Sequence, residues 1–182
     1  MDLKELSEKV TKDFKDKDIR ARNLIKVLIC GSYLGEDKKH IEDLRDELRN
    51  EFEIHGAFLM EDIISGEGIK LHQKFELIWH NINKGDNFPI CIIYAGKTAS
   101  ESLGLNAEIQ EIVKDMRKKQ NTFLIKHKNV NLIHHADEIV KCYTVSNPDE
   151  FKKIAKELIE RKLIEIVSFL NFMNRQRGED SK

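Results

Sequence analysis

A run of five apolar residues, Ile90 to Tyr94, ends abruptly in small and hydroxylated residues and is followed by a helical pattern. A continuous apolar run is typical of a strand that is buried on both faces, as in a parallel sheet between two layers of helices. The segment therefore indicates a buried parallel strand, a loop at its carboxyl end, and a helix that begins near Leu103. In open α/β sheets, ligands bind in crevices at the carboxyl ends of such strands.

Further apolar runs alternate with helical patterns along the whole chain. The expected strands are 24–30, 57–60, 89–94, 122–125 and 139–145. The expected helices are an N-terminal one that begins at 3 and ends before a connector at 15–18, followed by 37–52, 69–82, 103–119 and 149–173. This alternation is the pattern of a three-layer α/β domain with a parallel sheet. Right-handed crossovers and a single switch point favour a flavodoxin-like domain with strand order 2-1-3-4-5 and extra helices at both termini.

The length of 182 residues suits one domain with a full hydrophobic core. We expect an N-terminal helix and a charged connector (Lys15 to Asp18) within 1–22, an α/β core at 24–145, a C-terminal helix at 148–173 and a frayed polar tail at 174–182.

The charge balance argues against some classes of partner. Lys and Arg number 31 against 32 Asp and Glu, so a dedicated nucleic-acid binder, which would show a basic excess, is not expected. No apolar run approaches the roughly 18 residues of a membrane span, and the first residues lack the apolar core of a secretory signal. The three cysteines, Cys30, Cys91 and Cys142, fall in strand-like runs without C-x-x-C spacing, which favours reduced core thiols. We therefore expect a cytoplasmic protein with no membrane partner.

Glu108 is the acid that best fits a catalytic role. If Ser102 is the N-cap of its helix, Glu108 lies on the second turn, beyond the position that a capping box uses. It also lies at the edge of the apolar stripe, three residues after Leu105, where a raised pKa and a catalytic role are expected. The alternatives are an ordinary acid that complements the helix dipole, or a surface salt bridge with Lys114 or Lys118.

The turn Gly31-Ser32-Tyr33-Leu34-Gly35 follows the first strand. Its glycine lets the backbone approach a ligand closely, and the Ser32 hydroxyl can bond to phosphate or ribose. Tyr33 can stack on a base or sugar, or merely cover the end of the strand. In the expected strand order, this turn faces the loop at 95–102 across one cleft. A plain glycine-rich turn between strand and helix is the alternative.

Two other polar clusters are weaker candidates. The pair Glu61-Asp62 follows the second strand and can hold ribose hydroxyls, or it can simply be solvated. The segment His134-His135-Ala136-Asp137 looks like a ligand cluster, but adjacent histidines in a strand or helix do not face one another. The chain has no dinucleotide fingerprint, no P-loop and no metal-ligand spacing, so we expect neither a cofactor nor a metal.

The second half of the last helix, 163–173, is apolar almost all round. Such a helix needs partners on more than one side. It can be buried between the N-terminal helix and the sheet, or it can form a homodimer interface, and the sequence leaves both open.

Two short motifs resemble a known family. The segments Ile29-Cys30-Gly31-Ser32-Tyr33 and Ser102-Leu103-Gly104-Leu105-Asn106-Ala107-Glu108-Ile109 are similar to those of the nucleoside 2-deoxyribosyltransferase-like group. That group shares its broad architecture with the TIR-type and lonely-guy-type N-glycosidases. In these families, a Gly/Ser-rich turn follows the first strand, and a loop of small residues leads into a helix that carries a catalytic glutamate. The resemblance in layout covers residues 24–145.

The resemblance implies cleavage or transfer at the N-glycosidic bond of a nucleoside, a nucleotide or an NAD-like molecule, with Glu108 as the catalytic residue. The residues expected to bind the substrate are Gly31, Ser32, Tyr33, Glu61, Asp62, Ser102, Gly104 and Asn106. The loop at 95–100 lacks the aspartate usual in the transferases, a departure that bears on base recognition and on deoxyribosyl transfer. The acceptor, water or another base, stays open. The alternative is a non-catalytic nucleotide-binding or sensing module that dimerises through its C-terminal helix.

Overall fold

The computed structural model describes residues 2–63, 68–98, 103–132 and 141–179. Five strands form one parallel sheet in the order β2-β1-β3-β4-β5, as the sequence predicts. The strands are β1 (Ile25–Gly31), β2 (Ala57–Leu59), β3 (Phe88–Ala95), β4 (Thr122–His127) and β5 (Cys142–Val145). The helices are α1 (Leu3–Leu24), α2 (Gly35–Asn50), α3 (Met60–Ile63), α4 (Leu71–Ile82), α5 (Leu103–Val113), α6 (Met116–Gln120) and α7 (Pro148–Glu179).

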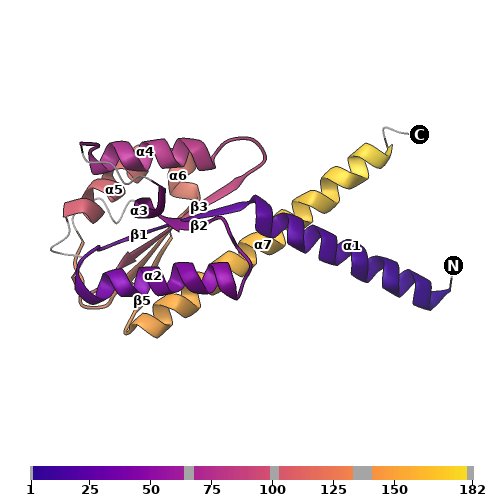
Figure 1. The fold of residues 1–182 in the computed structure, drawn as a ribbon, viewed down its shortest axis with the longest axis horizontal. Coiled ribbons are helices and arrows are strands. Elements are labelled where there is room, and N and C mark those ends of the chain that lie inside the picture. Colours follow the sequence, from indigo (N-terminus) through magenta and orange to yellow (C-terminus); the bar gives the residue numbers. More distant parts are fainter. Residues whose placement is uncertain (1, 64–67, 99–102, 133–140, 180–182) are drawn as a thin grey trace.

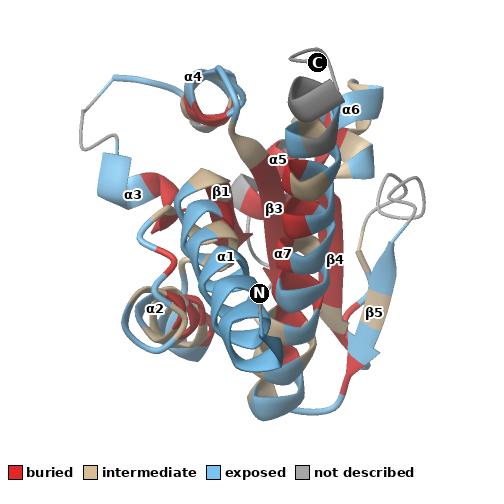
Figure 2. Cartoon of the chain, turned by 90° about the vertical axis from the view of Figure 1, so that its right-hand side faces the viewer, coloured by how far each residue is buried: buried red, intermediate tan, exposed pale blue. Residues whose placement is uncertain are grey.

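Helices cover both faces of the sheet, so the domain has the three expected layers (Figure 1). One core cluster joins the sheet to α2, α7 and the end of α1, and a second joins it to α4 and α5. In Figure 2, the residues coloured as buried lie along the central strands and along the side of α7 that faces them. The apolar run of β3 lies in the middle, since Ile90, Cys91, Ile92 and Ile93 are all fully buried. Burial on both faces is why this strand reads as a continuous apolar run rather than an alternating one.

The N-terminal helix is longer than the sequence suggested. The expected connector at Lys15–Asp18 is helical, and α1 runs without a break into β1. Charged pairs one turn apart stabilise this stretch: Lys17 Nζ lies 2.5 Å from Asp13, and Arg22 Nε lies 2.8 Å from Asp18. A dense run of charges was thus a solvated helical face and not a connector.

Three other expected boundaries were also wrong. The single helix expected at 103–119 is two helices, because Asp115 caps α6 by accepting hydrogen bonds from the backbone of Arg117 and Lys118. Met60, expected to end the second strand, begins α3 instead. The tail expected from 174 is helical as far as Glu179.

The cysteines divide between centre and edge of the sheet. Cys30 and Cys91 are buried, as expected, with their sulfur atoms 3.8 Å apart. Cys142 is exposed, against expectation, because β5 is the edge strand and only its last residue is buried.

Candidate functional site

The candidate site lies at the carboxyl ends of β1 and β3, where the strand order reverses. These two strands are neighbours, with Gly31 opposite Tyr94. A side chain on Gly31 would place its Cβ 2.9 Å from the carbonyl oxygen of Tyr94, so only glycine permits this approach of the two strands. The turn after β1 and the loop after β3 therefore begin side by side.

Hydrogen bonds join the two loops to the first turn of α2. Both the backbone N–H and the hydroxyl of Thr98 donate to Oδ2 of Asp37, at 2.8 and 2.5 Å. The hydroxyl oxygens of Ser32 and Thr98 are 2.8 Å apart. Because the single Thr98 hydroxyl proton goes to the carboxylate, the Ser32 hydroxyl donates to Thr98. We call Ser32, Asp37 and Thr98 the loop latch.

Gly96 makes the loop latch possible. A Cβ on Gly96 would lie 2.1 Å from Oδ1 of Asp37, so any other residue there would displace the carboxylate that Thr98 bonds to. The expectation that the turn after β1 faces the loop after β3 is confirmed for the part of that loop that the structure describes.

Glu108 lies on α5 and is fully buried. Neither of its carboxyl oxygens has a hydrogen-bond partner of normal geometry among the described residues. Burial raises the pKa of Glu108 to about 8, against a smaller opposing effect of the Cys30 thiol. The raised pKa is therefore confirmed.

Neither alternative to a catalytic role for Glu108, a surface salt bridge or a helix-dipole acid, fits the structure. The Lys114 ammonium lies 2.5 Å from Glu111, and Lys118 pairs with Glu76, so neither lysine forms the proposed salt bridge with Glu108. Glu108 is the sixth residue of α5, beyond the first turn to which the helix dipole effect is confined.

Tyr33, near the end of β1, carries a second buried polar group. Its hydroxyl is buried near the Met60 backbone and has no hydrogen-bond partner of normal geometry among the described residues. Burial raises the pKa of Tyr33, and the charge of Glu108 adds to the rise. The pKa of Cys30 is raised by its hydrogen bond to Cys91, by burial and, to a smaller extent, by the charge of Glu108. Such mutual effects on pKa require that Cys30, Tyr33 and Glu108 lie close together, at the end of β1.

The other residues that the sequence suggested form salt bridges outside the loop latch or lie wholly or partly outside the described part of the chain. Glu61 pairs with Lys38 at 3.1 Å. Asp62 pairs with Arg45 and Arg49 and accepts a hydrogen bond from the backbone of Leu59. Ser102 and the segment 134–137 lie outside the described residues. Gly104 and Asn106 lie at the start of α5, with side chains outside the described part.

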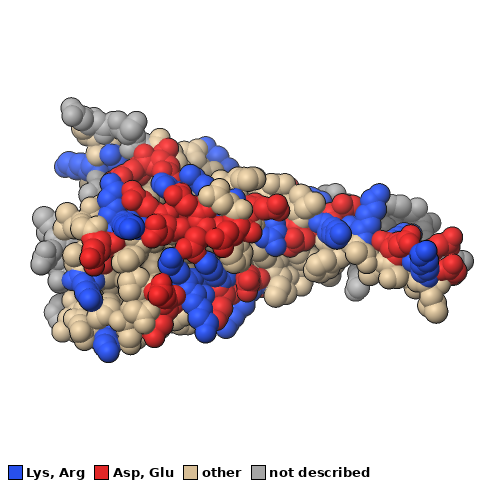
Figure 3. All heavy atoms as spheres, turned by 60° about the horizontal axis from the view of Figure 1, so that its bottom comes forward, with Lys and Arg blue, Asp and Glu red and all other residues tan. Residues whose placement is uncertain are grey.

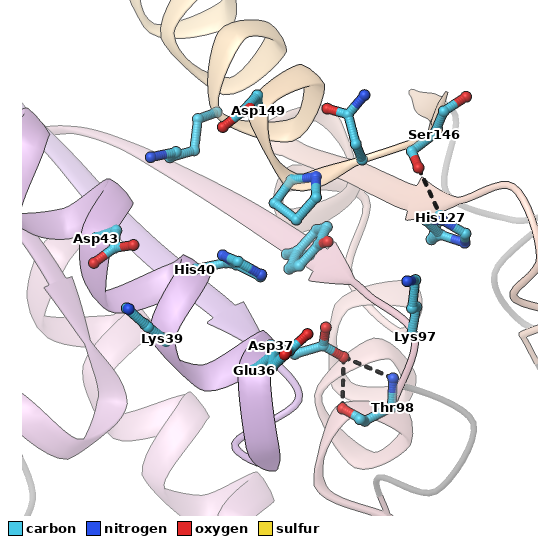
Figure 4. Close-up of a pocket in the computed structure, with 14 residues that line it drawn as sticks. Glu36, Asp37, Lys39, His40, Asp43, Lys97, Thr98, His127, Ser146 and Asp149 are labelled. Atoms are coloured by element: carbon cyan, nitrogen blue, oxygen red, sulfur yellow. Dashed lines mark hydrogen bonds between the residues drawn. The ribbon is translucent and has the colours of Figure 1, made fainter.

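A cavity of about 730 Å³ opens beside the loop latch, on the face covered by α2 and α7 (Figure 4). It is lined by Glu36, Asp37, Lys39, His40, Asp43, Tyr94, Lys97, Thr98, His127, Ser146, Asn147, Pro148, Asp149 and Lys152. Figure 4 shows His40 reaching from α2 and Lys97 reaching from the loop after β3 into this space. Its volume is in the range of small-molecule sites.

Glu108 is not among the residues that line this cavity. It is buried on α5, whose residues Leu105 and Ile109 belong to the core cluster on the α4 and α5 side of the sheet. Tyr33 packs against both core clusters, so it lies between the two parts of the site. The site therefore has a carboxyl part around Glu108 and an open part between α2 and α7.

The sequence interpretation missed His127, at the end of β4, and the turn at Ser146 and Asn147, after β5. His127 is buried, and its Nδ1 accepts a hydrogen bond from the backbone of Asn129 at 3.2 Å. Its Nε2 therefore carries the proton and donates to the carbonyl oxygen of Ser146 at 3.0 Å. His127 holds the turn in place. Its position at the carboxyl end of a strand was the signal that could have identified it.

The fold and this edge of the sheet define a three-layer, flavodoxin-like α/β domain with a ligand-sized crevice at its switch point. Neither the protein-family models nor the curated protein sequences give a match to this chain. Within the described residues, no helix is both long and apolar enough to cross a membrane.

Proposed function

We propose that the protein cleaves or transfers at the N-glycosidic bond of a nucleoside or nucleotide, with Glu108 as the catalytic residue. One observation carries the proposal: a fully buried carboxyl, without a hydrogen-bond partner of normal geometry among the described residues, lies near Cys30 and Tyr33 at the carboxyl end of β1. An orphaned buried carboxyl destabilises a fold, so its presence at this edge favours a role toward a ligand.

The chemistry needs Glu108 in its ionised form. A carboxylate oxygen of Glu108 bonds to C1′ of the sugar while the bond from C1′ to the base nitrogen breaks, and the electron pair leaves with the base, which takes a proton. Water, or a second base, then attacks C1′ and releases the Glu108 carboxylate. The mechanism is that of a retaining glycosidase.

Other residues of the site position the sugar and its substituents. The Tyr33 hydroxyl, buried beside Glu108, can donate to the carboxylate or to a sugar oxygen. Ser32 acts through the loop latch, since its hydroxyl is bonded to Thr98. Lys39 and Lys97 line the open part of the site, where they can pair with a phosphate of a nucleotide substrate.

The test is base release. The purified protein is incubated with nucleosides, nucleotides and NAD, and the free base is separated by chromatography. We expect release by the wild type and a rate at least about 1,000-fold lower for Glu108→Gln, as is usual when a nucleophile is removed. Glu111→Gln makes the same chemical change one turn further along α5 and should leave the rate near that of the wild type.

Equal rates for the wild type and Glu108→Gln would end the proposal, and so would background release by the wild type on every substrate. The second result would favour the alternative, a nucleotide-binding or sensing module without catalysis. The separation of Glu108 from the cavity wall is the observation that supports this alternative. Calorimetric binding of a nucleotide with no turnover, and with equal affinity for Glu108→Gln, would establish it.

A further inference from the structure

A row of exposed apolar side chains runs along the first half of α1. Leu3, Leu6, Val10 and Phe14 follow one another at helical spacing and are 86%, 42%, 59% and 60% exposed. The same face of the helix carries Ala21, which is fully buried in the core. The row is thus the continuation of a packing face beyond the end of the domain.

The far half of α7 also exposes apolar side chains. Ile164, Phe169 and Phe172 are 67%, 47% and 56% exposed. Figure 1 shows that α1 and α7 cross beside the sheet, extend past it and separate toward the two termini. Between them lies a groove of about 430 Å³, whose apolar walls include Phe14, Leu163, Ile164 and Val167.

We propose that a second copy of the chain covers these helices. One chain presents both an apolar row and an apolar groove, so a two-fold contact would use each of them twice, as isologous interfaces do. In that contact, the row Leu3, Leu6 and Val10 of each copy packs into the α1–α7 groove of the other.

The area and the charge of this surface fit a second copy. The seven exposed side chains offer roughly 800 Å² per chain if a fully exposed one contributes about 200 Å², and a standard interface buries about 800 Å² on each partner. Seven basic and five acidic residues are interspersed along α1, and Figure 3 shows both signs mixed along the projecting helices. A nucleic acid or an anionic membrane would favour a single basic face.

The test is sedimentation equilibrium of the full chain. The wild type should sediment as a dimer of twice 21.3 kDa, and the double variant Leu6→Glu/Val10→Glu should raise the dissociation constant at least about 100-fold. Both residues are exposed in the single chain, so the variant leaves its core intact, which circular dichroism verifies. Thr11→Glu, on α1 but off the apolar row, is the matched control and should stay dimeric.

A wild type that stays monomeric at about 100 μM, where a dimer of micromolar Kd would be largely formed, would overturn the proposal. So would a double variant as dimeric as Thr11→Glu. Flotation of a monomeric wild type with phosphatidylserine vesicles would assign the surface to a membrane instead. None of these outcomes depends on base release, so this test is independent of the role proposed for Glu108.

Discussion

At the scale of single residues, the protonation of Glu108 decides what the site can do. With a pKa raised to about 8 by burial, most of the carboxyl is protonated at pH 7 in the empty site. A protonated carboxyl cannot bond to C1′, so a nucleophilic Glu108 must lose its proton before or during substrate binding. Positive charge that develops on the sugar would favour this ionisation.

This requirement predicts a pH dependence. Because kcat/KM reports the ionisation of the free enzyme, it should rise about tenfold per pH unit below 8 and level off above it, provided that no other group limits the rate. Initial rates of base release between pH 5.5 and 9.5 measure the profile. A profile that falls above pH 8 would instead assign Glu108 as the general acid, and a flat one would remove it from the chemistry.

Some residues of the site were predictable, and others were not. The position of Glu108 at the edge of an apolar stripe, past the capping positions, was enough to predict a raised pKa. Asp37 looked like an ordinary acid in the first turn of a helix, although it is buried and bonded to Thr98. Its partner is 61 residues away in a loop whose conformation no local pattern specifies.

At the scale of elements, the loop latch fixes how the loop after β3 leaves the sheet. Thr98→Val keeps the shape of the side chain but removes the hydroxyl that bonds to Ser32 and Asp37. The Asp37 carboxylate is buried, so the loss should lower the free energy of unfolding by about 1–3 kcal/mol. Urea denaturation measures this change.

Thr144→Val is the matched control for the loop latch, because Thr144 is exposed on the edge strand β5. It should change the free energy of unfolding by less than about 0.5 kcal/mol. Equal effects of the two substitutions would mean that the loop latch contributes nothing beyond the propensity of threonine and valine for their local structure.

The elements themselves were largely predictable, because continuous apolar runs and helical stripes mark them directly. The errors fell where short-range polar contacts override the apolar period. Asp115 ends one helix and caps the next within an otherwise helical pattern, and the charges at Lys15–Asp18 continue a helix that looked interrupted. Neither contact changes the apolar pattern, so neither was visible in it.

At the scale of the whole molecule, the sheet order followed from the alternation of strands and helices together with right-handed crossovers. The course of α1 and α7 beyond the sheet could not be predicted, because an apolar row on a helix does not reveal what covers it. The sequence left open whether the last helix is buried or forms an interface. In the structure its inner residues, such as Ile166 and Leu170, are buried, and the outer ones, such as Ile164, are exposed.

The stability of the whole molecule against pH tests the buried, proton-holding state of Glu108 most directly, and no substrate is needed. A pKa of 4.5 in the unfolded chain and about 8 in the folded one means that folding takes up a proton between these values. The stabilisation of the protonated form is complete below pH 4.5 and is lost as the pH rises through 8.

The measurement is the free energy of unfolding of the wild type and of Glu108→Gln, by urea denaturation from pH 4.5 to 9. Glutamine stays neutral throughout, so the wild type should lose up to about 5 kcal/mol relative to the variant across this range, by 1.36 kcal/mol for each unit of pKa shift. A difference between the two proteins that does not change with pH would contradict a Glu108 held protonated and unpartnered at the switch point.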